Sequence, residues 1–83
     1  MDKQLAVIAI VVEKEESVEA LNSLLHEFRE YVIGRMGIPH KERGSSLISL
    51  AVDGPVDMIN ALSGKIGRLP GVSSKTAYSK VQD

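Results

Sequence analysis

The chain contains no cysteine. This absence excludes disulfides, thiolate nucleophiles and cysteine-ligated zinc or iron–sulfur sites. Aromatic residues are also scarce, with two tyrosines, one phenylalanine and no tryptophan, so single-stranded bases would find little to stack on. The net charge is −1, with acidic and basic residues interspersed, which provides no basic field for a phosphate backbone. We therefore expect no direct nucleic-acid binding.

Long hydrophobic runs are absent too. The longest spans residues 5–12, far short of the roughly 20 residues that a membrane-spanning helix needs. Lys3 precedes this run, as a basic residue precedes the apolar core of a signal peptide. However, no small-residue cleavage site follows, and the run leads straight into the charged segment 13–16, so it is interpreted as a strand. We expect residues 1–83 to form one cytoplasmic domain that does not enter a membrane.

Motifs for catalysis are missing as well. The sequence has neither a P-loop nor a dinucleotide-binding fingerprint, and no paired buried carboxylates are evident. One group of hydroxyl, imidazole and carboxylate side chains, His40, Glu42, Ser45 and Ser46, belongs to a single turn, which cannot arrange a catalytic triad. The sequence predicts a protein that is not an enzyme and that has no cofactor.

Two apolar runs are the most informative feature present. They are Leu5–Val12 (LAVIAIVV) and Leu47–Val52 (LISLAV), and the first does not alternate apolar with polar residues. Side chains of a strand alternate between its faces, so both faces of such a strand avoid water. Leaving about six apolar side chains exposed to water would lose on the order of 10 kcal/mol of stabilising free energy. A small chain cannot easily cover both faces, so we predict a homo-oligomer, a dimer or tetramer.

The remaining elements follow from periodicity. Residues 18–31 place their apolar side chains in one half of a helical wheel, with Ser17 as a plausible N-cap. Asp53-Gly54-Pro55 is expected to form a turn into a second helix, with Asp53 as its cap. The other expected segments are a strand over 32–39, a hairpin tip over 40–44, a strand over 46–52, a helix over 56–69, an edge strand over 72–78 and a frayed tail over 81–83.

The resulting order is β-α-β-β-α-β. In a chain of this length that order predicts an α+β, ferredoxin-like split sandwich, with a four-stranded antiparallel sheet and two helices on one face. The first and third strands occupy the middle of such a sheet, and they are the two most apolar strands here.

Two stretches are candidates for an effector or interface surface. The first is Arg35, Met36, Gly37, Ile38, Pro39 and His40, where a cation and glycines lie on a strand. It can receive an anion or a partner, or it can simply be a protected edge strand. The second is Asn60, Gly64 and Gly67, a strip nearly without side chains on the second helix. Close packing of the first helix, an early helix end, or an approaching ligand or subunit each accounts for it.

Histidines offer a weaker alternative. His26 and Glu30 have i,i+4 spacing, but His26 lies on the polar face of its helix, where a solvated side chain is the more common outcome. His40 stands alone in a turn, so the two histidines could meet only across a subunit interface. The alternative function is therefore a sensor or carrier of nickel, zinc or iron that uses interfacial His26 and His40.

The segments LAVIAIVVE, VIGRMGIPHKERG, ISLAVDG and LSGKIGRLPGV together resemble a family of small bacterial proteins named as regulators of the iron-only hydrogenase system. The resemblance covers nearly the whole chain, and GRMGIP-x-KERG is its most specific part. That family is similar in fold to ACT domains and to the C-terminal domain of nickel-responsive regulators, which are oligomeric, effector-sensing modules. The resemblance implies an ACT-like regulatory domain linked to that hydrogenase system.

Two departures limit what the resemblance carries over. Amino-acid-binding ACT domains have an Asp-x-Pro-Gly-like turn after the first strand, where this chain has Glu13–Glu16. Nickel-responsive regulators use a cysteine with histidines and carry a separate DNA-binding segment. The chain has no cysteine, and we expect its residues to be taken up by the one domain, with none left for such a segment. The resemblance therefore implies fold, oligomerisation and regulation by a small effector or partner protein, but neither an amino-acid site nor a nickel site.

Overall fold

The computed structural model describes residues 3–80, and the predicted frayed tail at 81–83 lies outside this range. The sheet strands are β1 (Lys3–Val12), β2 (Val32–His40), β3 (Ser45–Pro55) and β4 (Val72–Tyr78). The helices are α1 (Val18–Glu27) and α2 (Val56–Gly67), and short 3-10 turns lie at Glu15–Ser17, Arg29–Tyr31 and Lys41–Arg43. The strand order β2-β3-β1-β4, with every pair antiparallel, confirms the predicted ferredoxin-like split sandwich.

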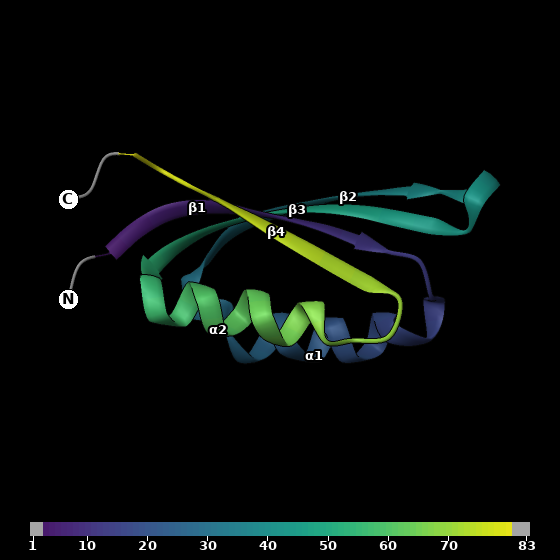
Figure 1. Ribbon diagram of the computed structural model, residues 1–83, viewed down its shortest axis with the longest axis horizontal. Coiled ribbons are helices and arrows are strands. Elements are labelled where there is room, and N and C mark those ends of the chain that lie inside the picture. Colours follow the sequence, from purple (N-terminus) through teal and green to yellow (C-terminus); the bar gives the residue numbers. More distant parts are fainter. Residues whose placement is uncertain (1–2, 81–83) are drawn as a thin grey trace.

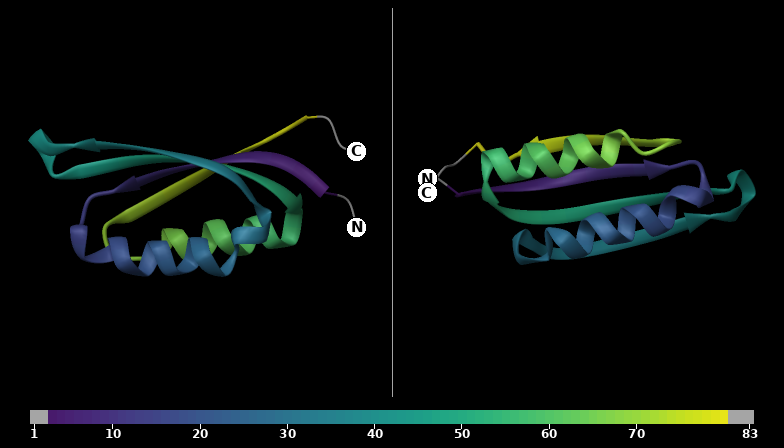
Figure 2. Two further views of the ribbon diagram at one scale, coloured as in Figure 1. Left: turned by 180° about the vertical axis from the view of Figure 1, so that it is seen from behind. Right: turned by 90° about the horizontal axis from the view of Figure 1, so that it is seen from below.

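The molecule has two layers. Both helices lie side by side on one face of the sheet, and no element of the described residues covers the opposite face (Figures 1 and 2). The core between the layers is built from alternate residues of the two central strands and from the apolar stripes of both helices. Its fully buried side chains are Ile8, Ile10, Leu21, Leu50, Val52, Ile59, Leu62 and Ile66.

The strand register places the two faces of β1 in different surroundings. Ala6, Ile8, Ile10 and Val12 point into the core and are buried, whereas Leu5 remains half exposed on the other face. The alternation that the sequence hides is therefore present in the structure. The chain's own core therefore explains why one face of the Leu5–Val12 run is apolar. It does not explain why the opposite face is apolar.

The first helix is shorter than predicted and is capped differently. α1 ends at Glu27, and the segment predicted to continue it to Tyr31 forms a 3-10 turn instead. Ser17 does occupy the N-cap position, but its side chain makes no capping bond. Its hydroxyl instead donates to the carbonyl oxygen of Pro70 at 2.6 Å. Ser17 is buried at that contact and ties the start of α1 to the loop before β4.

The turn predicted at Asp53-Gly54-Pro55 is also wrong. β3 continues through these residues, which pair with the start of β1, and the N-cap position of α2 is Pro55. Asp53 is therefore not a cap. Glycine is needed at position 54 because a Cβ there would approach within 2.8 Å of the Tyr31 ring. The ring of Tyr31 packs against the strand at that point.

The β2–β3 hairpin extends beyond the ends of both helices (Figure 1). Its tip contains the short turn Lys41–Arg43, followed by Gly44 at φ 65°. This is a left-handed conformation that glycine adopts without strain. The protruding hairpin leaves the end of the helix-facing sheet surface only partly covered.

Candidate functional site

The uncovered sheet face carries several exposed apolar side chains. Large apolar side chains from three strands are exposed there: Leu5 (50%), Val7 (44%), Met36 (63%), Ile38 (56%) and Leu47 (48%). We call this surface the open face. Contiguous exposed apolar surface of this kind marks an interaction site in a soluble protein.

Small residues occupy the middle of the open face. Across the sheet, Gly34 pairs with Ala51, Ala51 with Val7, and Val7 with Ala77. In the neighbouring row Ser49 lies opposite Ala9. Several side chains in the centre of the face are therefore short, which allows a second backbone layer to approach closely.

The predicted stretch from Arg35 to His40 belongs to two surfaces, not one. Arg35 and Gly37 lie opposite Leu50 and Ile48, on the helix-facing side of β2. Met36 and Ile38 alternate with them and belong to the open face. The sequence identified this stretch as a candidate surface. It did not show which residues belong to which face, because that depends on the register of β2 against β3.

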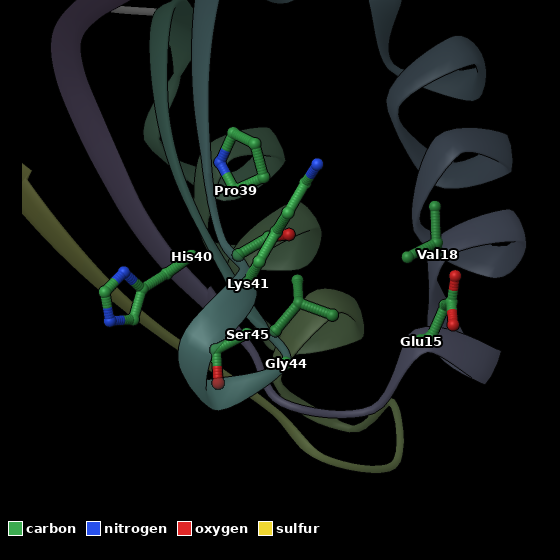
Figure 3. A pocket seen from close by; sticks show the side chains of 9 residues that line it. Glu15, Val18, Pro39, His40, Lys41, Gly44 and Ser45 are labelled. Carbon is green, nitrogen blue, oxygen red and sulfur yellow. The ribbon is translucent and has the colours of Figure 1, made fainter.

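On the helix-facing side, a groove runs between α1 and β2. One cavity of about 260 Å³ lies beside Gly37, and a second of about 320 Å³ lies beneath the hairpin tip. The two share four lining residues, Val12, Val18, Pro39 and Ser46, and so adjoin each other along the groove. In Figure 3, Glu15 and Val18 face Pro39 and Lys41 across the groove, whereas His40 points away from it.

Arg35 crosses the groove from the strand to the helix. Its Nη1 donates to Oδ1 of Asn22 at 3.4 Å, a long and exposed hydrogen bond. A further cavity of about 470 Å³ lies on the other side of this bond, with His26 and Arg29 in its lining. Sequence reasoning missed Asn22, because it lies on the polar face of α1 and nothing in the pattern distinguishes it from solvated neighbours.

The strip of Asn60, Gly64 and Gly67 is exposed and runs beside β4, not against the first helix. Asn60 Oδ1 accepts a hydrogen bond from the hydroxyl of Tyr78. A Cβ at Gly67 would lie 3.3 Å from the Oγ of Ser74, so this glycine leaves room for β4. A Cβ at Gly64 would meet only the end of the Arg68 side chain, at 3.9 Å. The helix does end at Gly67, and the three residues do not line the groove.

The two histidines do not meet within the described residues. His26 lies near the end of α1 and lines a cavity with Val32 at the start of β2, whereas His40 ends β2 at the hairpin tip. Among residues 3–80, no group of three or more histidine or acidic side chains could hold a metal ion. The interfacial metal site stays a prediction that would require a partner subunit.

Over the same described range, neither helix is long or apolar enough to cross a bilayer.

The fold and the sequence place the chain in a family. A family model described as "TM1266-like: Iron-only hydrogenase system regulator, putative" matches residues 4–76. The chain belongs to this family, as the resemblance predicted. No curated protein was found to be similar to the chain.

One solved structure agrees with this assignment. The chain is similar to the uncharacterized protein TM1266 from Thermotoga maritima, with 38% identity and a TM-score of 0.90, over 94% of this chain and 99% of that one. It is also similar to a formyltetrahydrofolate deformylase from Pseudomonas putida KT2440, with 14% identity and a TM-score of 0.63. The match covers 88% of this chain but only 28% of the deformylase chain, and at that identity it shows the fold alone.

Proposed function

We propose that the chain is a non-enzymatic regulatory module that assembles as a homo-oligomer through its open face and responds to a small effector or a partner protein. The family is named for regulation of the iron-only hydrogenase system, which supports a role in that system. The observation that carries the proposal is the apolar open face, with Leu5, Val7 and Leu47 each about half exposed on the two central strands.

The size of the open face supports a second copy as its occupant. Four strands about 4.8 Å apart and about seven residues long, at about 3.3 Å per residue, cover roughly 450 Å². Two such faces in contact bury roughly 900 Å², close to the roughly 1,000 Å² at which specific interfaces begin. The charged side chains on this side of the strands lie toward its margins: Lys3 and Asp53 are near strand ends, and Lys75 is on the edge strand β4. Two copies can therefore meet through the centre of the face without burying a charge.

A substitution at the centre of the open face tests the assembly. We expect Val7→Lys to convert an oligomer into a folded monomer, because each subunit would bring a charge to the middle of an apolar contact. Sedimentation velocity and native mass spectrometry report the subunit number, and circular dichroism reports the fold. Ser23→Lys adds the same charge to an exposed position on α1 and should leave the oligomer intact. A wild-type monomer, or an unchanged Val7→Lys oligomer, would contradict the proposal.

The regulatory role has its own test. In a bacterium with an iron-only hydrogenase, deleting the gene for this chain should change hydrogenase activity. Expression of the wild-type chain should restore the original level, and Val7→Lys should not. Unchanged hydrogenase activity in the deletion strain would argue against the hydrogenase link while leaving the assembly untouched.

A further inference from the structure

Gly37 is a glycine that its own chain does not require. Its φ is not positive, and a Cβ at this position would meet only the Cγ1 of Ile48 at 4.0 Å, an ordinary contact distance. Glycine inside a strand nevertheless destabilises the strand. A strand glycine without an internal reason is typical of a position that another group approaches closely.

The missing side chain opens a hollow in the groove. Gly37 lies between Arg35 and Pro39 on the helix-facing side of β2, and all three line the cavity of about 260 Å³. Much of the remaining lining is apolar and comes from three elements, through Val12, Val18, Leu21 and Ile48. The hollow is therefore suited to an aliphatic or aromatic group.

Arg35 supplies a charge at one end of the same hollow. Its hydrogen bond to Asn22 uses one of the five N–H donors of the guanidinium group, so the remaining donors can still bind an anion. The cavity on its other side is lined by His26 and Arg29. Neither of the two cavities that share Arg35 has a carboxylate in its lining, although Glu15 lines the adjoining cavity beneath the hairpin tip and exposed acidic residues lie elsewhere on α1. The surroundings of Arg35 therefore favour a negative charge.

We propose that the groove binds a small organic acid, with its carboxylate on Arg35 and its apolar body in the hollow beside Gly37. This acid would be the effector of the regulatory module, so the inference rests on the proposed function. A carboxylate matches the guanidinium fork and forms charge-assisted hydrogen bonds that a neutral amide cannot form. Acetate offers the same charge without a body to fill the hollow.

Titration of the ¹⁵N-labelled full chain tests this proposal. Isovalerate and phenylacetate are the probes, and isovaleramide and acetate are the matched controls. We expect saturable shifts of the amide signals of Asn22, Gly37 and Ser46 with both probes. Isovaleramide should bind about tenfold more weakly because it lacks the charge. Equal binding of isovalerate and its amide, or no saturable shift with either probe, would overturn the proposal.

Two pairs of variants assign the binding to the groove. Gly37→Val should weaken isovalerate binding at least tenfold by filling the hollow, whereas Gly64→Val, at an exposed position of α2 outside the groove, should leave binding unchanged. Arg35→Gln should also weaken it about tenfold, whereas Arg43→Gln at the hairpin tip should not. Heteronuclear spectra of each variant verify the fold. If Gly64→Val and Gly37→Val weaken binding equally, the site is not the groove.

The same experiments separate this inference from the proposed function. An oligomer that binds neither probe contradicts the groove site and leaves the assembled module standing. A monomer that binds isovalerate through Arg35 contradicts the assembly and leaves the groove site standing.

Discussion

At the scale of single residues, Ser17 shows how position and role can differ. The sequence correctly placed it at the start of α1, where serine often caps a helix. Its hydroxyl instead reaches Pro70, 53 residues further along the chain. A local pattern cannot reveal such a contact, because the partner is a backbone carbonyl that only the tertiary fold brings near.

We expect Ser17→Ala to lower the free energy of unfolding by about 1–2 kcal/mol, because the buried contact to Pro70 would be lost and its acceptor left unpaired. Urea unfolding measures this change. Ser23→Ala, at an exposed position on the same helix, should change it by less than about 0.5 kcal/mol. Equal stability of the two variants would contradict the prediction that the Ser17–Pro70 hydrogen bond stabilises the fold.

Two glycines should respond oppositely to the same substitution. Gly71 has φ 70°, and a Cβ there would lie 2.5 Å from the Cγ of Lys14, so Gly71→Ala should destabilise the protein by about 2 kcal/mol. Gly64 lies inside α2 with open space around it, so Gly64→Ala should stabilise it by about 1 kcal/mol. Thermal unfolding should therefore rank the wild type between the two variants, and the reverse ranking would contradict this interpretation.

At the scale of elements, periodicity was sufficient for most of the fold. The stripes of α1 and α2 and the turn glycines predicted six main elements in the right order. Errors occurred where tertiary contacts override local preference. Asp53-Gly54-Pro55 contains three residues typical of turns, but pairing with β1 and packing of Tyr31 on Gly54 keep it in the sheet.

The edge strand β4 is joined to α2 by a row of hydroxyl contacts. Ser74 Oγ donates to the carbonyl oxygen of Ser63 at 2.9 Å, and Thr76 Oγ1 donates to the Ser63 hydroxyl at 3.1 Å. These partly buried bonds fix an edge strand whose side chains are mostly polar. They also show that the strand is held by its helix as well as by β1.

We expect Ser63→Ala to destabilise the protein by about 1 kcal/mol and to speed amide hydrogen exchange in β4 more than in β3, since Thr76 would lose its hydroxyl partner. Ser73→Ala lies on the same strand but on the exposed side and serves as the control. Exchange that rises uniformly across the sheet would indicate a global effect instead of a local one.

At the scale of the whole molecule, stability and association are linked. Hydrophobic association favours the folded subunit by mass action, so the thermal midpoint should rise with protein concentration. We expect this rise for the wild type and none for Val7→Lys, measured by calorimetry over a wide concentration range. A wild-type midpoint independent of concentration would count against an assembly coupled to folding.

The candidate site was less predictable than the fold. The stretch around Arg35 stood out because a cation and two glycines are unusual in a strand, and the structure places Arg35 and Gly37 in a groove. Asn22 and Lys41 also line that groove, but they come from a helix and a turn that nothing in the sequence connects. Periodicity predicts which face a residue occupies, and only the packed fold determines which faces meet.

The central position of β1 has a consequence for protein synthesis. β1 is made first, yet one of its two neighbours in the sheet is the last strand to be made, with Ala6 opposite Tyr78. At about 5–20 residues per second, translation of the intervening chain takes several seconds. During this interval the edge of β1 that later pairs with β4 has no partner strand, and the apolar LAVIAIVV segment is only partly buried. We expect nascent chains arrested before β4 to recruit chaperones, and a permuted chain that makes β4 before β1 to shorten that exposure.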